Sequence, residues 1–353
     1  MKRFGVIGAG AWGTMHARAY AQCGEAELTA VCDLDIARAR ALVERCGAPG
    51  ARAFDRVDDM LASGLDAVSV ATPDASHADV VIKAAGRGLH IMVEKPLATT
   101  VEECRAMVAA ADSAGVILMV DWHNRWNPPY HHAHKAIRAG ELGDVRYVYY
   151  RLSDAIWVAT RMLPWASKSS VMWFLGSHAL DTTCWLVGRK PLRVTCRKTE
   201  GVLTGRGVST PDLFVTLVDF EGGALAVIEN LWILPDSSPA LIDHKCEIVG
   251  TAGVITIDPT HNRSFEKHTA AQAAAPARDA GAPPDFPLPD MFVTPEIHGR
   301  QMGFAVESIY HFAHCVATGA KPLATGRDGL LNTTLITAAL RSADEGRPVE
   351  VGA

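Results

Sequence analysis

A glycine-rich segment near the start of the chain has the residue types and spacing needed to bind a pyrophosphate. Gly8-Ala9-Gly10-Ala11-Trp12-Gly13 directly follows a short apolar run and precedes a stretch with helical spacing. In this pattern the first glycine permits a tight turn, the second lets a pyrophosphate approach the backbone, and the third allows close helix-to-strand contact. The helix N-terminus attracts the negative charge. The segment predicts a dinucleotide-binding loop, with an ordinary glycine-rich loop as the alternative.

An acidic residue lies at the distance expected for binding the adenosine ribose. Asp33 ends the second predicted strand, about 20 residues beyond Gly13, where its carboxylate can bind both ribose hydroxyls. A 2′-phosphate would be repelled by Asp33 and by Asp35, so NAD is the favoured cofactor. Arg38 and Arg40 lie nearby, so NADP stays an alternative cofactor. The alternative is that Asp33 only ends a strand.

The elements that would position these residues alternate regularly over the first 120 residues. Short apolar runs followed by helical stretches predict βαβ units and a parallel sheet. The expected strands are residues 3–7, 28–32, 67–70, 90–93 and 117–120, and the expected crossover helices are residues 14–23, 36–46, 77–87 and 101–114.

The pattern changes after Pro128-Pro129, where a second domain is expected. Alternating segments separated by glycine turns predict a mostly antiparallel sheet, and residues 270–290, rich in Ala, Pro, Gly and Asp, predict a mobile loop. The expected helices are 130–139, 171–187, 296–317 and 330–344, and the expected strands include 145–152, 213–220, 225–232 and 245–257. The predicted fold class is α/β: an N-terminal Rossmann domain (residues 1–122) and a C-terminal α+β domain (residues 123–353) with a large, mostly antiparallel open sheet.

Further motifs follow in a fixed order along nearly the whole chain. They are Ala71-Thr72-Pro73 through His77, Glu94-Lys95-Pro96, His123-Asn124-Arg125-Trp126-Asn127-Pro128, Gly176-Ser177-His178-Ala179-Leu180-Asp181 and Ala320-Lys321-Pro322. With the glycine loop, this series resembles the Gfo/Idh/MocA oxidoreductase family. The resemblance implies a homodimer or homotetramer. One face of the C-terminal sheet would form the subunit contact, and the other face would line the cleft.

The resemblance also implies that Lys95 and His178 flank a reacting carbon, with Glu94 and the Thr72-Pro73 turn near the nicotinamide. Oxidation of an alcohol needs a base for the hydroxyl proton and a group that stabilises the developing alkoxide. Histidine titrates near neutral pH, so His178 is the expected base and Lys95 its electrostatic partner. The reverse assignment stays open, as do a solvated Lys95 and a His178 that only packs in the core.

The predicted helix over residues 171–187 places Phe174, His178 and Asp181 on one face. Many family members carry an aspartate one turn before the histidine, and Phe174 stands there in this chain. The departure puts a three-residue proton relay in doubt. Asp181 is then expected to bind a substrate hydroxyl or orient His178, with a helix-stabilising role as the alternative.

Further residues are expected near the ligands. His77 either begins a helix close to the cofactor or only caps that helix. His123 and Asn124 follow the last strand of the first domain, where family members place groups that touch substrate. An aromatic wall with a cation suits a polyhydroxylated ring, and the candidates for it are Trp157, Arg161 and Trp165, with surface packing as the alternative.

Composition limits the other function classes. The chain of 353 residues has 48% hydrophobic and 21% charged residues and a net charge of −5 without a basic stripe, so neither nucleic acid nor a membrane is an expected partner. The eight cysteines are scattered, and the first predicted strand begins too close to Met1 for a signal peptide, which favours the cytoplasm. The cluster of His131, His132 and His134 offers at most two ligands on one helix face, so no metal is expected.

The function hypothesis is therefore an NAD(P)-dependent dehydrogenase or reductase that acts on CH–OH groups. Its expected substrate is a small-molecule polyol: a sugar, a glycoside or an inositol-like cyclitol. The alternatives are a non-catalytic sensor that keeps the dinucleotide and sugar pockets, or a dehydrogenase of another substrate such as a dihydrodiol, an imine or a tetrapyrrole.

Overall fold

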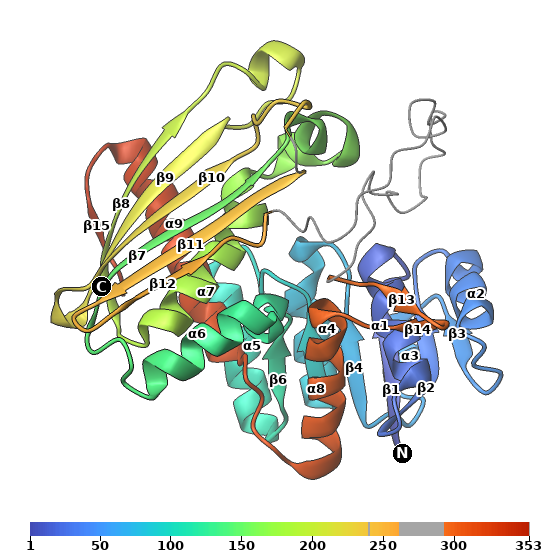
Figure 1. Ribbon diagram of the computed structural model, residues 1–353. Coiled ribbons are helices and arrows are strands. Elements are labelled where there is room, and N and C mark those ends of the chain that lie inside the picture. The colour runs from blue at the N-terminus through green and yellow to red at the C-terminus, as the bar shows by residue number, and fades with distance from the viewer. Residues whose placement is uncertain (239–240, 261–292, 353) are drawn as a thin grey trace. The chain divides into compact units, whose positions relative to one another are not determined.

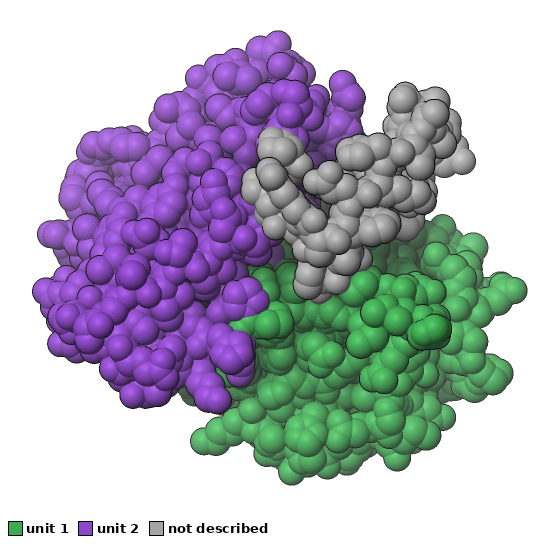
Figure 2. All heavy atoms as spheres, in the orientation of Figure 1, with its two compact units in different colours: residues 1–128, 292–337 green, residues 129–291, 338–353 purple. Residues whose placement is uncertain are grey.

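The computed structural model describes residues 1–238, 241–260 and 293–352. The chain forms two compact units (Figure 2). Unit 1 contains Met1–Pro128 and Phe292–Thr337, and unit 2 contains Pro129–Met291 and Ala338–Ala353. The predicted loop over residues 270–290 lies outside the described residues.

Unit 1 is built on a six-stranded parallel sheet with the order β3-β2-β1-β4-β5-β6 (Figure 1). This order places the glycine loop, which follows β1, at the centre of the sheet, where doubly wound proteins bind dinucleotides. The strands are β1 (Lys2–Ile7), β2 (Ala26–Cys32), β3 (Arg52–Phe54), β4 (Ala67–Val70), β5 (His90–Val93) and β6 (Leu118–Val120). The predicted parallel sheet is confirmed, with β3 as an additional edge strand.

Helices cover both faces of this sheet, because successive side chains of a strand point to opposite faces. Val6 packs in the core on the side of α1 and α2, whereas Ile7 packs in the core on the side of α4 and α5. The helices are α1 (Ala11–Gln22), α2 (Ile36–Arg45), α3 (Val57–Leu61), α4 (His77–Gly86) and α5 (Val101–Ala114). The packing of helices on both faces of the sheet fixes the strand ends that carry the candidate residues.

A segment from the C-terminal part of the chain completes unit 1. Helix α8 (Phe304–Thr318) buries Ile309 and Phe312 in the core beside α1, and the Phe312 ring meets Phe4 edge-on at 5.8 Å. The predicted domain boundary after residue 122 follows chain order, whereas the compact unit recruits this later helix. The helix predicted from residue 296 was wrong at its start: residues 296–301 form the hairpin of β13 (Glu296–Ile297) and β14 (Arg300–Gln301), with Gly299 at a φ of 75°.

Unit 2 is built on a seven-stranded sheet with the order β12-β11-β7-β10-β9-β8-β15. Every neighbouring pair in it is antiparallel except β7 and β10, so the predicted mostly antiparallel sheet is confirmed. The strands are β7 (Val145–Asp154), β8 (Pro191–Thr199), β9 (Leu213–Phe220), β10 (Leu225–Leu231), β11 (Ile242–Gly250), β12 (Val254–Ile257) and β15 (Val349–Glu350). Unit 2 also contains the helices α6 (Pro128–Arg138) and α7 (Ser177–Val187), and the boundary between the units falls within α9 (Gly326–Glu345).

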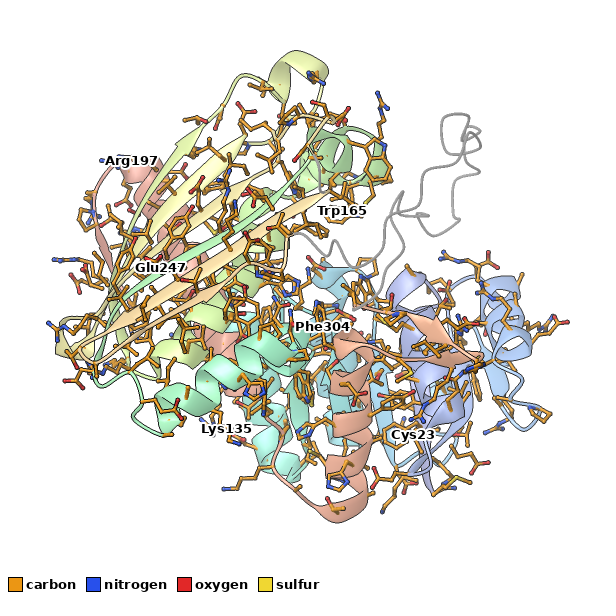
Figure 3. All side chains as sticks on the ribbon, in the orientation of Figure 1. Cys23, Lys135, Trp165, Arg197, Glu247 and Phe304 are labelled. Carbon is orange, nitrogen blue, oxygen red and sulfur yellow. The ribbon has the colours of Figure 1, made fainter. Side chains whose placement is uncertain are left out.

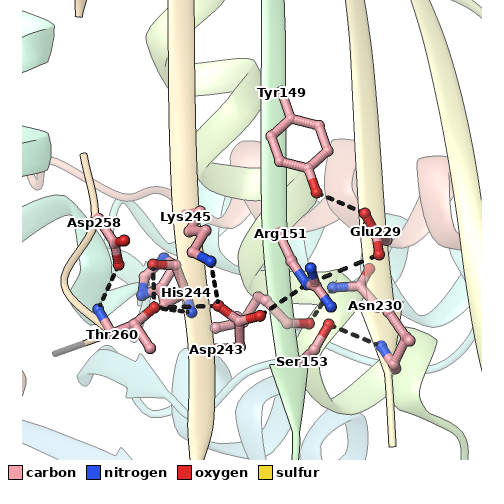
Figure 4. A network of polar contacts seen from close by, with 12 residues as sticks. Tyr149, Arg151, Ser153, Glu229, Asn230, Asp243, His244, Lys245, Asp258 and Thr260 are labelled. Carbon is pink, nitrogen blue, oxygen red and sulfur yellow. Dashed lines mark hydrogen bonds and ion pairs between the residues drawn. The ribbon is translucent and has the colours of Figure 1, made fainter. Parts of the chain in front are cut away.

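The two faces of this sheet differ in chemistry. On β7, Val148 and Tyr150 are fully buried, and α7 packs on this strand. The intervening positions carry half-buried polar groups: Tyr149 donates to Glu229 at 2.6 Å, and Arg151 pairs with Asp243 at 3.1 Å (Figure 4). The sheet therefore has one apolar face under helices and one amphipathic face.

Candidate functional site

The glycine loop has the geometry that pyrophosphate binding requires. A Cβ at Gly13 would lie 1.7 Å from the carbonyl oxygen of Gly8, so only glycine allows the first turn of α1 to approach β1 this closely. Gly8 has a φ of 100°, in the left-handed region that favours glycine. A Cβ at Gly10 would meet nothing within 4 Å. The position next to the N-terminus of α1 is therefore open to a ligand.

The acid predicted to bind ribose is tied to this loop. The Asp33 carboxylate accepts the backbone N–H of Ala9 at 2.8 Å and that of Asp35 at 3.0 Å. These contacts hold the carboxylate at the end of β2, beside the glycine loop. The side chains of Arg38 and Arg40 are exposed on α2.

His77 connects the two loops that the sequence places near the nicotinamide. It is fully buried at the start of α4, with Nε2 2.9 Å from the carbonyl oxygen of Thr72 and Nδ1 3.0 Å from that of Pro96. Carbonyl oxygens only accept, so a neutral imidazole donates to one loop at a time and an imidazolium donates to both. His77 is thus more than a helix cap: it links the Thr72-Pro73 turn to the Lys95-Pro96 turn.

A buried polar network lies next to Lys95. His16 on α1 approaches Glu94 at 3.0 Å and Asp121 at 3.6 Å through Nε2, and its Nδ1 lies 3.0 Å from the Ser69 hydroxyl. That hydroxyl in turn lies 2.5 Å from the hydroxyl of Tyr20. His16, Ser69, Asp121 and Tyr20 are each 0% exposed. The network joins α1 to the carboxyl ends of β4, β5 and β6.

The charges in this network are strongly coupled. Burial raises the pKa of Asp121 to about 7, and the nearby Glu94 carboxylate adds to the effect. Burial alone would also raise the pKa of Glu94, but the hydrogen bond and charge of His16, with Lys95 and His123, lower it below its ordinary range. The site therefore favours an ionised Glu94 beside a protonated Asp121 below neutral pH.

His123 begins the turn that follows β6 and contacts two aromatic rings. Its imidazole lies parallel to Trp12 at 5.6 Å and also meets Phe304 at 5.6 Å. Burial lowers the pKa of His123 to about 4, with Lys95 among the further causes, so the ring is neutral at physiological pH. Asn124 follows it and is 6% exposed. The structure thus brings Trp12 of the glycine loop to the predicted substrate-binding turn.

In unit 2, the predicted helix over residues 171–187 is helical throughout, but its first part is not an α-helix. Met172–Gly176 forms a π-helical turn and α7 begins at Ser177. A Cβ at Gly176 would lie 2.7 Å from the sulfur of Met172 and 3.1 Å from Oδ1 of Asn230, so tight packing against β10 accompanies the change. His178 and Asp181 still share one face of α7, and they are 8% and 3% exposed.

Phe174 belongs to an aromatic cluster. Its ring meets Trp165 at 5.7 Å and Trp232 at 5.8 Å. Trp165 is 41% exposed and is labelled in Figure 3, whereas Trp232 is buried and donates through Nε1 to Asp154 at 3.2 Å. The exposed ring of Trp165 therefore packs on the half-buried ring of Phe174, which in turn packs on the buried Trp232.

The other two members of the predicted aromatic wall are less closely engaged with this cluster. Trp157 is half-buried, and its backbone N–H donates to Asp236 at 3.0 Å. Arg161 is exposed in the short helical turn that follows.

Sequence reasoning missed the network around Asp121. His16 is one turn inside α1, between the buried residues Met15 and Ala17, and a histidine on an apolar helix face was the available signal. Asp121 directly follows a fully buried strand, which is a position typical of ligand-facing groups. Ser69 lies within a strand of buried residues and gave no comparable signal.

Among the described residues, His16, Glu94 and Asp121 are the group whose ligand atoms lie close enough together, within 4.8 Å, to hold a metal ion. Both nitrogens of His16 already approach protein partners in this arrangement: Nε2 a carboxylate and Nδ1 a hydroxyl. The donor set fits an internal hydrogen-bond network better than an open coordination site.

The residues of unit 1 fit a bound dinucleotide. Gly10 borders open space, α1 begins without a side-chain cap, and Oγ1 of Thr72 is buried with no hydrogen-bond partner in the described part of the chain. These are an anion site and an orphaned polar group at the carboxyl edge of a doubly wound sheet. The fold and this site define a dinucleotide-binding protein of the doubly wound class.

Comparison with known proteins identifies the family. Residues 2–122 match the family model described as "Oxidoreductase family, NAD-binding Rossmann fold", and residues 130–256 match the model of the GFO/IDH/MocA C-terminal domain. The chain belongs to the Gfo/Idh/MocA oxidoreductase family, and its N-terminal unit is an NAD-binding Rossmann fold.

Two related dehydrogenases align with almost the whole chain. D-apiose dehydrogenase of Paraburkholderia graminis is 29% identical over 99% of this chain and 90% of its own length. Inositol 2-dehydrogenase of Rhizobium meliloti is 28% identical over 99% of both chains.

Solved structures share the fold. The crystal structure of a putative myo-inositol dehydrogenase from Sinorhizobium meliloti superposes with a TM-score of 0.79 at 25% identity, over 100% of both chains. That of scyllo-inositol dehydrogenase from Lactobacillus casei, solved with NAD(H) and scyllo-inositol, gives a TM-score of 0.79 at 18% identity, again over 100% of both chains. In the described residues, no helix combines the length and apolar character that crossing a membrane requires.

Proposed function

We propose that this enzyme transfers a hydride between NAD and a secondary hydroxyl or the corresponding ketone of a sugar, a glycoside or a cyclitol. The observation that carries the proposal is the link in unit 1 between the cofactor loops and Lys95: His77 joins the Thr72 turn to the Lys95-Pro96 turn. The names of the relatives, dehydrogenases of apiose and of inositols, support the substrate class.

The bound nicotinamide supplies the hydride acceptor or donor, and the residues of the chain supply the remaining chemistry. In the direction of oxidation, His178 accepts the hydroxyl proton and the Lys95 ammonium stabilises the alkoxide that develops. Asp181, on the same face of α7, orients His178 or binds a neighbouring hydroxyl. Phe174 removes the carboxylate of the usual relay, so this chain relies on His178 and Lys95.

The remaining predicted residues bind the ligands. Gly8, Gly10, Ala11, Trp12 and Gly13 hold the pyrophosphate, Asp33 binds the ribose, and Thr72, Pro73, His77 and Glu94 hold the nicotinamide half. His123, Asn124, Trp157, Arg161 and Trp165 contact the substrate. An exposed tryptophan such as Trp165 suits the apolar face of a pyranose or cyclitol ring.

Substitution of the two reacting groups tests this mechanism. Lys95→Ala and His178→Ala should each lower kcat by at least about 100-fold while the Kd for NAD changes little, because base and oxyanion contributions have this size. The matched controls are Lys190→Ala and His132→Ala, which remove exposed side chains of the same types. Turnover that survives in both active-site variants contradicts the assignment.

A substrate panel tests the reaction class itself. Cyclitols, aldoses, glycosides and their keto forms are each assayed with NAD(H) and NADP(H) through nicotinamide absorbance. Turnover of one polyol class with NAD supports the proposal. Tight binding of both NAD and a polyol without any turnover would instead identify a sensor.

We also propose that the amphipathic face of the unit 2 sheet forms a homo-oligomer interface. Leu217 and Val215 on β9 are 37% and 38% exposed, and the strand register places Val215 opposite Glu229 of the polar network. Exposed apolar side chains flanked by ion pairs are typical of subunit interfaces. Leu217→Glu should lower the mass measured by light scattering, whereas Val202→Glu, at a position 45% exposed elsewhere in unit 2, should not.

The cytoplasm is the proposed location. In support, the eight cysteines are scattered along the sequence without a Cys-x-x-Cys pair.

A further inference from the structure

Two carboxylates lie buried together next to Lys95. Glu94 precedes Lys95 at the end of β5 and is 6% exposed, and Asp121 follows β6 and is 0% exposed. Both approach the same nitrogen of His16, at 3.0 Å and 3.6 Å. Burying two negative charges this close together is costly, because each loses its hydration and the two repel each other.

The donors in the network satisfy only one of the two carboxylates. Nε2 of His16 makes its short contact with Glu94, and within the described residues neither oxygen of Asp121 accepts a hydrogen bond. The Ser308 hydroxyl, which faces Asp121, donates instead to the carbonyl oxygen of Ala305 at 2.9 Å. A carboxylate without donors is the one that keeps a proton when two acids compete. The asymmetry of the contacts therefore distinguishes the two acids.

We propose that Glu94 and Asp121 hold one negative charge and one proton between them, with the proton on Asp121, and that Asp121 is thereby a positioning residue for Lys95. The inference rests on the proposed hydride transfer, in which the ammonium of Lys95 stabilises the alkoxide. Below neutral pH, Lys95 has one buried counter-charge. Loss of the Asp121 proton gives Lys95 a second buried counter-charge.

The surroundings of Asp121 are consistent with this role. Burial and the Glu94 carboxylate raise the pKa of Asp121, while His16, Ser308 and Lys95 oppose the rise. These groups face Asp121 from α1, α8 and the turn after β5. The hydroxyls of Ser69 and Tyr20 continue the network from His16 and can rotate to suit either protonation state of its ring.

The second charge has a predictable effect on catalysis. An added negative charge near Lys95 favours its ammonium form, so the wild-type protein retains alkoxide stabilisation at alkaline pH. Asp121→Asn keeps the shape of the side chain but stays neutral at every pH. The variant should match the wild type at pH 6 and fall to about one tenth of the wild-type kcat/KM at pH 9, a difference of about 1.4 kcal/mol.

Two measurements test the proposal. The first uses protein without substrate: infrared difference spectra should show a protonated carboxylic acid that titrates near pH 7 and is lost in Asp121→Asn. Labelling the wild type with 13C-aspartate should shift this band, which assigns it to an aspartate rather than to Glu94. A spectrum without such a band overturns the proposal, whatever the activity of the protein.

The second measurement is the pH profile of kcat/KM with NAD and the best substrate of the panel. The control is Asp212→Asn, another substitution of a buried aspartate, at a residue of unit 2 whose carboxylate accepts two backbone N–H groups. Superimposed profiles of Asp121→Asn and the wild type would overturn the positioning role. If the infrared band is present and no polyol is turned over, the proposed function fails while the proton on Asp121 stands.

Discussion

The protonation of Asp121 predicts how the stability of the fold changes with pH. An aspartate has an ordinary pKa of 3.8, and in the folded chain the pKa of Asp121 is raised to about 7. The folded state therefore holds this proton more tightly than the unfolded state does. The stabilisation is fully present below pH 3.8 and is lost as the pH rises through about 7.

The size of the effect follows from the same two values. A shift from 3.8 to about 7 is about 3 pKa units, or about 4 kcal/mol at 1.36 kcal/mol per unit. The residue is 0% exposed, so solvent does not screen the effect. Between pH 5 and pH 8, the wild-type free energy of unfolding should fall by about 2 to 3 kcal/mol relative to that of Asp121→Asn.

Urea unfolding followed by far-UV circular dichroism measures this difference. The wild type and Asp121→Asn are unfolded at pH 5, 6, 7 and 8, and equal m-values confirm that the exposed surface is comparable. Asp212→Asn reports the cost of placing an amide at another buried aspartate. A constant difference between the wild type and Asp121→Asn across this range would refute the raised pKa.

The other predictions concern the cofactor loops. Gly13→Ala should lower the free energy of unfolding by about 3 kcal/mol or more, since its Cβ would lie 1.7 Å from a carbonyl oxygen; urea unfolding measures this loss. Gly10→Ala meets no atom within 4 Å and should instead leave stability within about 1 kcal/mol while weakening NAD at least about tenfold in calorimetry. His77→Ala should cost about 2 kcal/mol in unfolding and change both KM for NAD and kcat in steady-state kinetics. Asp33→Ala should lower the ratio of kcat/KM with NAD to kcat/KM with NADP. An equal ratio in the variant and the wild type would show that Asp33 does not bind the ribose.

Local sequence patterns predicted the parts of the fold that local interactions decide. The parallel strands of unit 1 are short apolar runs with helices between them, so their positions follow from hydrophobic periodicity. β3, only three residues from Arg52 to Phe54, lacks such a run and is stabilised by pairing with β2. The π-helical turn before α7 depends on packing at Gly176 against β10, which periodicity does not reveal.

Long-range contacts explain what the sequence did not predict. The apolar face of α8 is visible in the sequence, but nothing local indicates that Phe312 packs against Phe4. The network around Asp121 is similar: His16 and Glu94 are 78 residues apart, and each alone has an ordinary structural explanation. Only the order of strands β4, β5 and β6 brings their carboxyl ends to α1 and makes these residues one cluster.

His77 and Asp121 act on Lys95 by different physical means, and this difference separates their effects. His77 contacts the backbone of the Lys95-Pro96 turn and of the Thr72 turn, so its loss should disturb both cofactor binding and turnover at every pH. Asp121 contributes a charge that depends on pH, so its replacement by asparagine should leave the loops in place and change only the alkaline part of the profile. A variant of His77 that altered only the alkaline limb, or a variant of Asp121 that weakened NAD equally at all pH values, would contradict this division between backbone geometry and electrostatics.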